Sequence, residues 1–204
     1  MENGGIMNLL WWMVEIVSSM YMVDLVSGMV HLYLDYQVID DETLRKHVEK
    51  SIVAIQEFEK SAMFRNATFW DQFLWDFQIH HQVPFPAAVS EWELTMQIAR
   101  PVALPYIISA CAYAMGFLNG SFARIWLLTL TWSPFVQATH FAAHRRTHGK
   151  LTNSAICVLQ DYGLLLSAAS HKKHHEEFDC NFCIFNGWAN PVVNWIGRVC
   201  FGTK

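Results

Sequence analysis

The chain has 204 residues, enough for one domain, and its formal net charge of -4 gives no reason to expect a nucleic-acid partner. Hydrophobic residues make up 53% of the sequence, with nine Trp and fourteen Phe, whereas charged residues make up only 16%. This composition is high in apolar residues for a soluble domain and favours contact with lipid. We therefore predict a single domain over residues 1–204 that is integral to a membrane.

Three apolar segments are candidates for membrane-spanning helices. Residues 6–23 and 101–118 are each long enough to cross a hydrocarbon layer of about 30 Å. Residues 122–137 follow the short turn Asn119-Gly120-Ser121, so the last two segments are expected to form an antiparallel helical hairpin. The first segment lacks a basic flank and a cleavage site, and we interpret it as a retained helix rather than a signal peptide. The predicted fold is all-α, with about three transmembrane helices plus interfacial helices that carry a histidine-rich metal site.

The distribution of basic residues predicts the topology. Of the fourteen Lys and Arg, only Arg124 lies within residues 101–137, beside the turn, where it could snorkel to the headgroups. By the positive-inside rule the turn faces the lumenal or external side, and all histidine motifs face the cytoplasm. Charged residues 40–65 have the spacing of an amphipathic helix, and residues 156–169 are expected to lie at the interface. We expect a multi-pass protein of the endoplasmic reticulum or another internal membrane.

Histidine is the residue type that carries the chemistry. His47 stands alone in a charged segment and is interpreted as a solvated side chain, while the position of His148 leaves its role open. Residues at i, i+3 and i+4 of a helix share one face, so clustered histidines at these spacings can direct their imidazoles at one point. The groups are His31 with Asp35, the pair His80 and His81, His140 with His144 and His148, and His171 with His174 and His175.

The number of histidines exceeds what one metal ion needs. A structural zinc site closes with four ligands and a catalytic one commonly has three from the protein, so two metals fit better. Imidazole ligands permit iron, zinc or copper, and the spacing does not choose among them. A redox metal such as iron is required if the reaction is activation of oxygen to attack an unactivated C–H bond.

Carboxylates and cysteines have less specific patterns. Asp24, Asp35 and Asp161 are candidates to accept the second ring N–H of a ligating imidazole, with a helix cap or a salt bridge as the alternative. The five cysteines are an odd number in apolar or membrane-adjacent segments, so reduced thiols are expected. Cys180 and Cys183 are spaced like half a zinc site, but no second pair accompanies them and packing is the favoured interpretation.

Four segments carry these motifs in a characteristic order. They are residues 24–35 with His31, residues 77–84 with His80 and His81, residues 140–144 with His140 and His144, and residues 159–190 with His171, His174 and His175. This order resembles the Kua-type lipid desaturase family, which includes the plasmanylethanolamine desaturases and a plant plastid phosphatidylglycerol desaturase. The chain differs from that pattern at residues 90–96, which lack a histidine and a polar run, and at Ser170, where many relatives have a histidine.

The resemblance implies a diiron enzyme that uses oxygen, and electrons from a small carrier such as cytochrome b5 or a ferredoxin, to insert a double bond into a lipid chain. It implies as iron ligands His31, His80, His81, His140, His144, His171, His174 and His175. A lipid hydroxylase is the nearest enzymatic alternative, because a similar oxidant can deliver oxygen instead of removing a second hydrogen. A non-catalytic membrane protein that binds zinc or senses metal is the alternative from another class.

Overall fold

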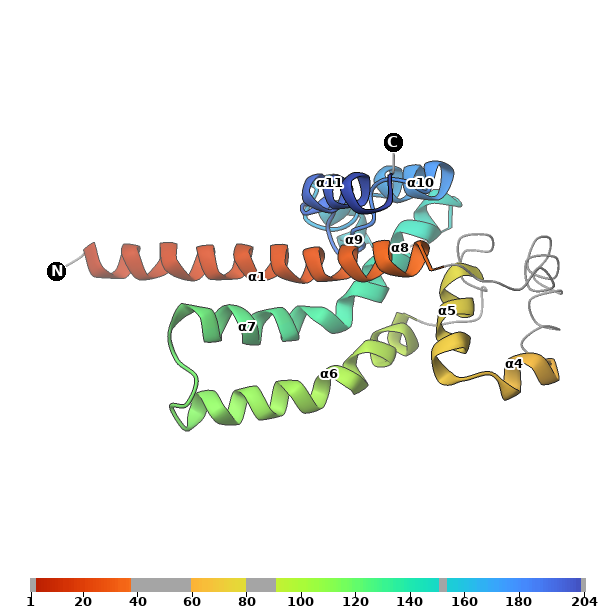
Figure 1. Cartoon of the computed structure of the whole chain (residues 1–204). Helices are drawn as coiled ribbons and strands as arrows, with labels where there is room; N and C mark the ends of the chain where they lie inside the picture. The colour runs from red at the N-terminus through yellow and green to blue at the C-terminus, as the bar shows by residue number, and fades with distance from the viewer. Residues whose placement is uncertain (1–2, 38–59, 80–90, 151–153, 203–204) are drawn as a thin grey trace. The chain divides into compact units, whose positions relative to one another are not determined.

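The computed structural model of the chain describes residues 3–37, 60–79, 91–150 and 154–202. Every regular element within these ranges is a helix, and no strand forms among them (Figure 1). The prediction of an all-helical protein is therefore confirmed for this part of the chain. The elements are α1 (Asn3–Asp35), α4 (Ala62–Asn66), α5 (Phe69–Ile79), α6 (Glu91–Ala114), α7 (Gly120–Trp132), η1 (Ser133–Phe135), α8 (Val136–Thr147), α9 (Ser154–Asp161), α10 (Ala168–Glu177) and α11 (Asn190–Phe201).

Helix α1 is the longest element, and its 33 residues extend for about 50 Å at 1.5 Å per residue. Its segment Met7–Asp35 is the one helix in the described ranges that is long and apolar enough to cross a membrane. Large apolar side chains such as Leu9, Trp11 and Val17 are exposed along it. A contiguous exposed apolar surface of this kind is typical of contact with lipid or with another protein.

Helices α6 and α7 form the helical hairpin that the sequence predicted. The chain turns between them at Gly116 and Gly120, whose φ angles of 78° and 73° lie in the left-handed region that glycine adopts readily. The indole N–H of Trp126 on α7 donates to the Ser109 hydroxyl on α6 at 3.0 Å. The apolar part of α6, Ile98–Ala114, falls below full-span length, and α7 has 13 residues. The second and third membrane crossings therefore stay predictions.

An ion pair joins α1 to α7. The Arg124 guanidinium donates to both carboxylate oxygens of Glu15, at 2.8 and 2.5 Å, and it also donates to Ser121 at 3.1 Å. The guanidinium carbon lies 5.4 Å from the centre of the Trp12 ring. Glu15 itself is buried. An acidic residue on an apolar helix needs a partner, and Arg124 supplies it.

The chain divides into two compact units, residues 1–29 with 90–204, and residues 30–89. In the second unit, the Gln78 amide on α5 donates to the backbone oxygens of Leu34 and Gln37, at 3.0 and 2.7 Å. Short helix α4 begins after Ser61, whose hydroxyl accepts the N–H of Phe64 at 3.1 Å as an N-cap. The predicted amphipathic helix over residues 40–65 lies largely outside the described residues.

The hydrophobic core of the first unit packs α1 and α8 against the segments that flank α10. Gly28 of α1 makes the closest approach, because a Cβ atom added there would lie 2.4 Å from the Cys183 sulfur. This contact leaves no room for a larger residue without movement of the neighbouring chain. The buried members of the core are Val23, Val136, Ala143, Leu166, Ile184 and Phe185.

Candidate metal centre

Two short helices, α8 and α10, supply the histidines that come together. The Ser167 hydroxyl caps the start of α10 by accepting the N–H of Ser170 at 3.1 Å. The hydroxyl of Thr147, at the end of α8, donates to the backbone oxygen of Ala168 at 3.3 Å and links the two helices. Each helix then presents one pair of histidines at i and i+4, which lie on the same face as the spacing predicted.

The two pairs of imidazoles converge through their Nε2 atoms. His140 Nε2 lies 3.2 Å from His144 Nε2, and His144 Nε2 lies 2.8 Å from His171 Nε2. His175 Nε2 in turn lies 3.0 Å from His171 Nε2. The ligand atoms of all four residues fall within 4.8 Å of one another. We call this set, His140, His144, His171 and His175, the histidine row.

Hydrogen bonds alone do not satisfy the histidine row. The Nε2 of a neutral imidazole offers either one proton or one in-plane lone pair, so four such atoms in sequence form at most two full hydrogen bonds across their three contacts. Nitrogen ligands about 2.1 Å from a shared metal ion lie about 3.0–3.4 Å apart, by comparison. The observed separations of 2.8–3.2 Å are close to this range. The row therefore fits a metal ion.

Burial keeps these imidazoles in the state that metal binding needs. His140, His144 and His171 are all buried. Burial, and then the proximity of His140, His144 and His175, hold the pKa of His171 well below its usual range. A ligating histidine must be neutral, and the lowered pKa favours the neutral form of His171. Its Nδ1 is also buried, with no hydrogen-bond partner in the described part of the chain.

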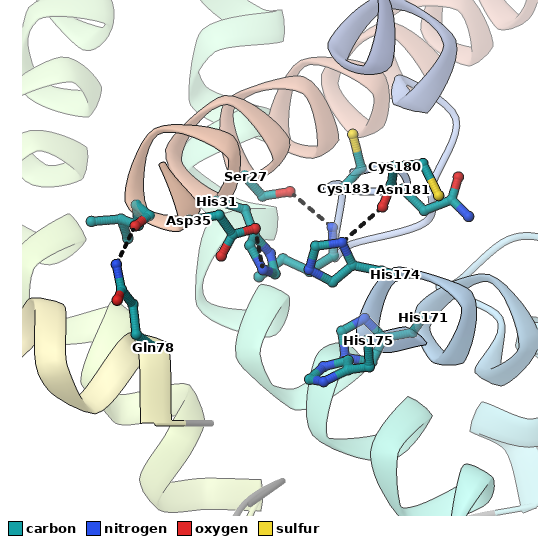
Figure 2. A network of polar contacts seen from close by, with 12 residues as sticks. Ser27, His31, Asp35, Gln78, His171, His174, His175, Cys180, Asn181 and Cys183 are labelled. Atoms are coloured by element: carbon teal, nitrogen blue, oxygen red, sulfur yellow. Dashed lines mark hydrogen bonds and ion pairs between the residues drawn. The ribbon is translucent and has the colours of Figure 1, made fainter. Parts of the chain in front are cut away.

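Groups outside the row orient two of the predicted ligands. The Nδ1 of His140 lies 3.3 Å from the side-chain oxygen of Gln137, one turn earlier on α8. The Nδ1 of His174 lies 2.7 Å from the backbone oxygen of Cys180, as Figure 2 shows. Because an acceptor at Nδ1 fixes the proton there, Nε2 is left with its lone pair for a metal. Sequence reasoning missed Gln137, although its i−3 position relative to His140 places it on the same helix face.

His31 lies in the second unit. Its Nε2 is 3.6 Å from Asp35 Oδ2, and its ring meets the Phe77 ring edge-on at 4.8 Å between centroids. This separation is an ion-pair contact and is too long for a hydrogen bond, so the role of Asp35 in orienting His31 stays a prediction. The remaining predicted ligands, His80 and His81, lie outside the described residues, as does His47.

The other two candidate carboxylates have partners other than imidazoles in the structure. Asp161 Oδ1 accepts from the Arg146 guanidinium at 2.6 Å, at an exposed position. Asp24 is fully buried and accepts four backbone N–H groups from the segment before α11. Its donors are Phe185 at 3.2 Å, Asn186 at 2.8 Å and Gly187 at 3.0 Å to Oδ1, and Ala189 at 2.9 Å to Oδ2. No pattern of side chains in the sequence indicates this arrangement.

His148 and the two spaced cysteines stay apart from the row. His148 is exposed at the end of α8, and its N–H bonds to the backbone oxygen of His144 at 3.1 Å. Cys183 is buried against Gly28, and burial and the nearby Asp24 carboxylate raise its pKa well above the usual range. All five cysteines are free thiols. Cys183 is therefore a buried packing residue, in agreement with the favoured interpretation of the sequence.

These observations define a helical protein with one long apolar helix and a buried cluster of histidines that could hold a metal. The lipid desaturase domain matches residues 64–198, which is more than half of the chain and includes the whole histidine row. The protein therefore belongs to the lipid desaturase domain family, whose members are membrane-associated. Membership indicates lipid desaturation as the general activity, an oxidoreductase reaction on a lipid, and suggests iron as the metal. No curated protein and no solved structure matches the chain.

Proposed function

We propose that the protein is a multi-pass membrane desaturase that holds two iron ions and introduces a double bond into an acyl or alkyl chain of a lipid. The observation that carries this proposal is the histidine row, whose four Nε2 atoms converge in a way that hydrogen bonds cannot satisfy and a metal can. The matched domain supplies the reaction class.

Bound iron would supply the redox chemistry that activates oxygen for attack on an unactivated C–H bond. The chain's own residues hold the metal and set its surroundings. We propose that all eight predicted histidines are ligands, which is enough for two ions: His31, His80, His81, His140, His144, His171, His174 and His175. Gln137 and the Cys180 carbonyl then act by fixing ring orientation, which strengthens the imidazoles as ligands.

The apolar helices are proposed to hold the lipid. Exposed residues along α1, such as Trp11 and Val26, form a surface that suits hydrocarbon. With α6 and α7 as the second and third spans, the histidines lie at the cytoplasmic face of the endoplasmic reticulum or another internal membrane. Electrons come from an external carrier such as cytochrome b5 or a ferredoxin, and the ether lipids that yield plasmalogens are one substrate class to test.

Lipid analysis tests the reaction. Cells that express the protein should contain a lipid that has lost two hydrogens relative to its precursor, because desaturation removes a hydrogen from each of two adjacent carbons. The His174→Ala variant should lose this product, whereas His47→Ala should retain it. A product that carries a new hydroxyl group would refute desaturation and establish the hydroxylase alternative.

Metal analysis tests the cofactor. The purified full-length protein should contain close to two irons per chain. One zinc per chain without iron would refute the diiron proposal and favour a non-catalytic protein that binds or senses metal.

A further inference from the structure

The Asp24 carboxylate makes four hydrogen bonds to one short segment, which we call the clamp loop (residues 184–189). We propose that Asp24 is a positioning residue that acts through the clamp loop to hold α8 and α10 in the register at which their histidines share a metal ion. The inference rests on the proposed metal-dependent function and adds to it a residue that touches neither metal nor substrate.

Charge is essential to this arrangement. Asp24 has no exposed surface, and a buried carboxylate is tolerated only when its oxygens are fully hydrogen-bonded. Successive backbone N–H groups that converge on one point form a concavity that binds an anion, and the clamp loop supplies such a concavity. An asparagine has the same size but carries two hydrogens on one of its terminal atoms. Asp24→Asn would therefore set an N–H2 group against at least one backbone N–H.

The clamp loop is bound directly to α8. The Thr139 hydroxyl donates to the backbone oxygen of Ile184 at 2.9 Å, and Thr139 immediately precedes His140. The N–H of Ile184 donates to the Ser27 hydroxyl on α1 at 3.3 Å, drawn as a dashed line in Figure 2. Ile184, one residue before the first Asp24 contact, is thus hydrogen-bonded both to α1 and to the residue beside the predicted ligand His140.

The clamp loop is also bound to the start of α10. The peptide N–H of Phe185 donates to Asp24, while the backbone oxygen of Phe185 accepts the N–H of Leu166 at 2.8 Å. Leu166 is fully buried and precedes Ser167, the N-cap of the helix that carries His171. Displacement of Phe185 would therefore move the point from which α10 begins.

These contacts give Asp24 one route to each half of the histidine row, through Thr139 to α8 and through Leu166 to α10. Neither route includes a side-chain contact with an imidazole. Loss of the Asp24 charge should change the relative position of the two histidine pairs while each pair stays intact within its own helix.

Cobalt binding tests the inference with a readout other than activity. Co²⁺ accepts imidazole ligands, and its visible absorption bands report the geometry of the bound ion. We would titrate the full-length protein in detergent with Co²⁺, comparing wild type with Asp24→Asn. We expect Asp24→Asn to bind Co²⁺ on the order of 10–100-fold more weakly, the usual effect of losing a group that supports metal ligands, and with shifted bands. Its helical circular dichroism and gel-filtration profile should match wild type.

Two further variants make the test specific. Glu15→Gln is the matched control, because Glu15 is also a buried acid on α1 but its carboxylate accepts from Arg124 on α7 instead of the clamp loop, and it should give the wild-type titration. Thr139→Val keeps the size of the side chain and removes the bond to Ile184, so it should reproduce the shifted bands. If Asp24→Asn does not fold, the Thr139→Val titration tests the positioning role in its place.

The outcomes separate this inference from the proposed function. Wild-type affinity and bands in a folded Asp24→Asn, or in Thr139→Val where Asp24→Asn does not fold, would overturn the positioning role and leave the metal centre intact. A wild-type protein that binds no Co²⁺, or binds it no better than His171→Ala, would refute the metal centre itself, and the positioning role with it.

Discussion

His171 is the residue whose removal should damage the metal centre most. Its Nε2 lies between two others in the histidine row, that of His144 at 2.8 Å and that of His175 at 3.0 Å. His144 is also central, but its second neighbour, His140, is farther away at 3.2 Å. Replacement with alanine removes the atom that connects the α8 pair to the rest of α10. The remaining three imidazoles no longer surround one point.

The size of the effect follows from the number of ligands. A structural site of four protein ligands contributes about 10–16 kcal/mol of binding free energy, or about 2.5–4 kcal/mol for each ligand if they share it equally. Each 1.4 kcal/mol corresponds to a tenfold change in affinity, so His171→Ala should weaken metal binding by about 100–1000-fold. His175→Ala should have a smaller effect, because this half-exposed ring lies at the end of the row, where water can take its place.

Chelator competition measures these affinities. The variants would be loaded with Fe²⁺ or Zn²⁺ in detergent, dialysed against increasing chelator, and analysed for retained metal. His148→Ala is the control, since His148 is exposed and lies outside the row. Retention of metal by His171→Ala at the wild-type chelator midpoint would refute the assignment of the histidine row as the binding site. An equal loss in His148→Ala would show that the assay reports basic surface residues instead.

Three other predictions follow from described contacts. Gln137→Leu should weaken metal binding by about 10–100-fold with the fold intact, because the His140 ring loses the acceptor at its Nδ1, and the same chelator titration measures it. Arg124→Leu should lower the thermal inactivation temperature more than the double replacement with Glu15→Leu, because the single change leaves a buried carboxylate without its partner; equal loss in both would refute the pairing argument. Burial and the Glu177 carboxylate raise the pKa of Cys180 to about 11. At pH 8.5 this thiol should therefore react with iodoacetamide on the order of 100-fold more slowly than in the unfolded chain, and Cys183 should react more slowly still. Rapid alkylation of either thiol in the native protein would contradict the packing interpretation.

The sequence predicted the elements of the site better than their surroundings. Helical spacing alone places His140 beside His144 and His171 beside His175, because these pairs depend only on the geometry of a single helix. The all-helical class and the α6–α7 hairpin were likewise available from apolar run lengths and the turn at Gly120. These features depend on residues that are close together in the chain, so they can be predicted from a single sequence.

The partners of the buried charged residues could not be predicted from local sequence patterns. Glu15 is an acid on an apolar helix, but its partner Arg124 lies 109 residues away, and only the packing of α7 on α1 brings them together. Asp24 is predicted from the sequence to orient an imidazole, and the four hydrogen bonds to its carboxylate in the structure come from backbone groups. Backbone N–H groups are present at nearly every residue, so no pattern of side chains reveals where they converge.

The distant partners of α1 have a consequence for how the protein is made. Helix α1 leaves the ribosome before the segments that bind its acidic residues, and Asp24 finds its first clamp-loop donor 161 residues later, which at about 5–20 residues per second is a delay of roughly 10–30 s. The Glu15 carboxylate likewise has no partner until Arg124, 109 residues later, has been synthesised. Until those segments are synthesised, each acid is without its native partner, and inserting a helix with unpartnered acids into lipid would be costly. We expect α1 to stay in a hydrated site until the segments that supply these partners emerge.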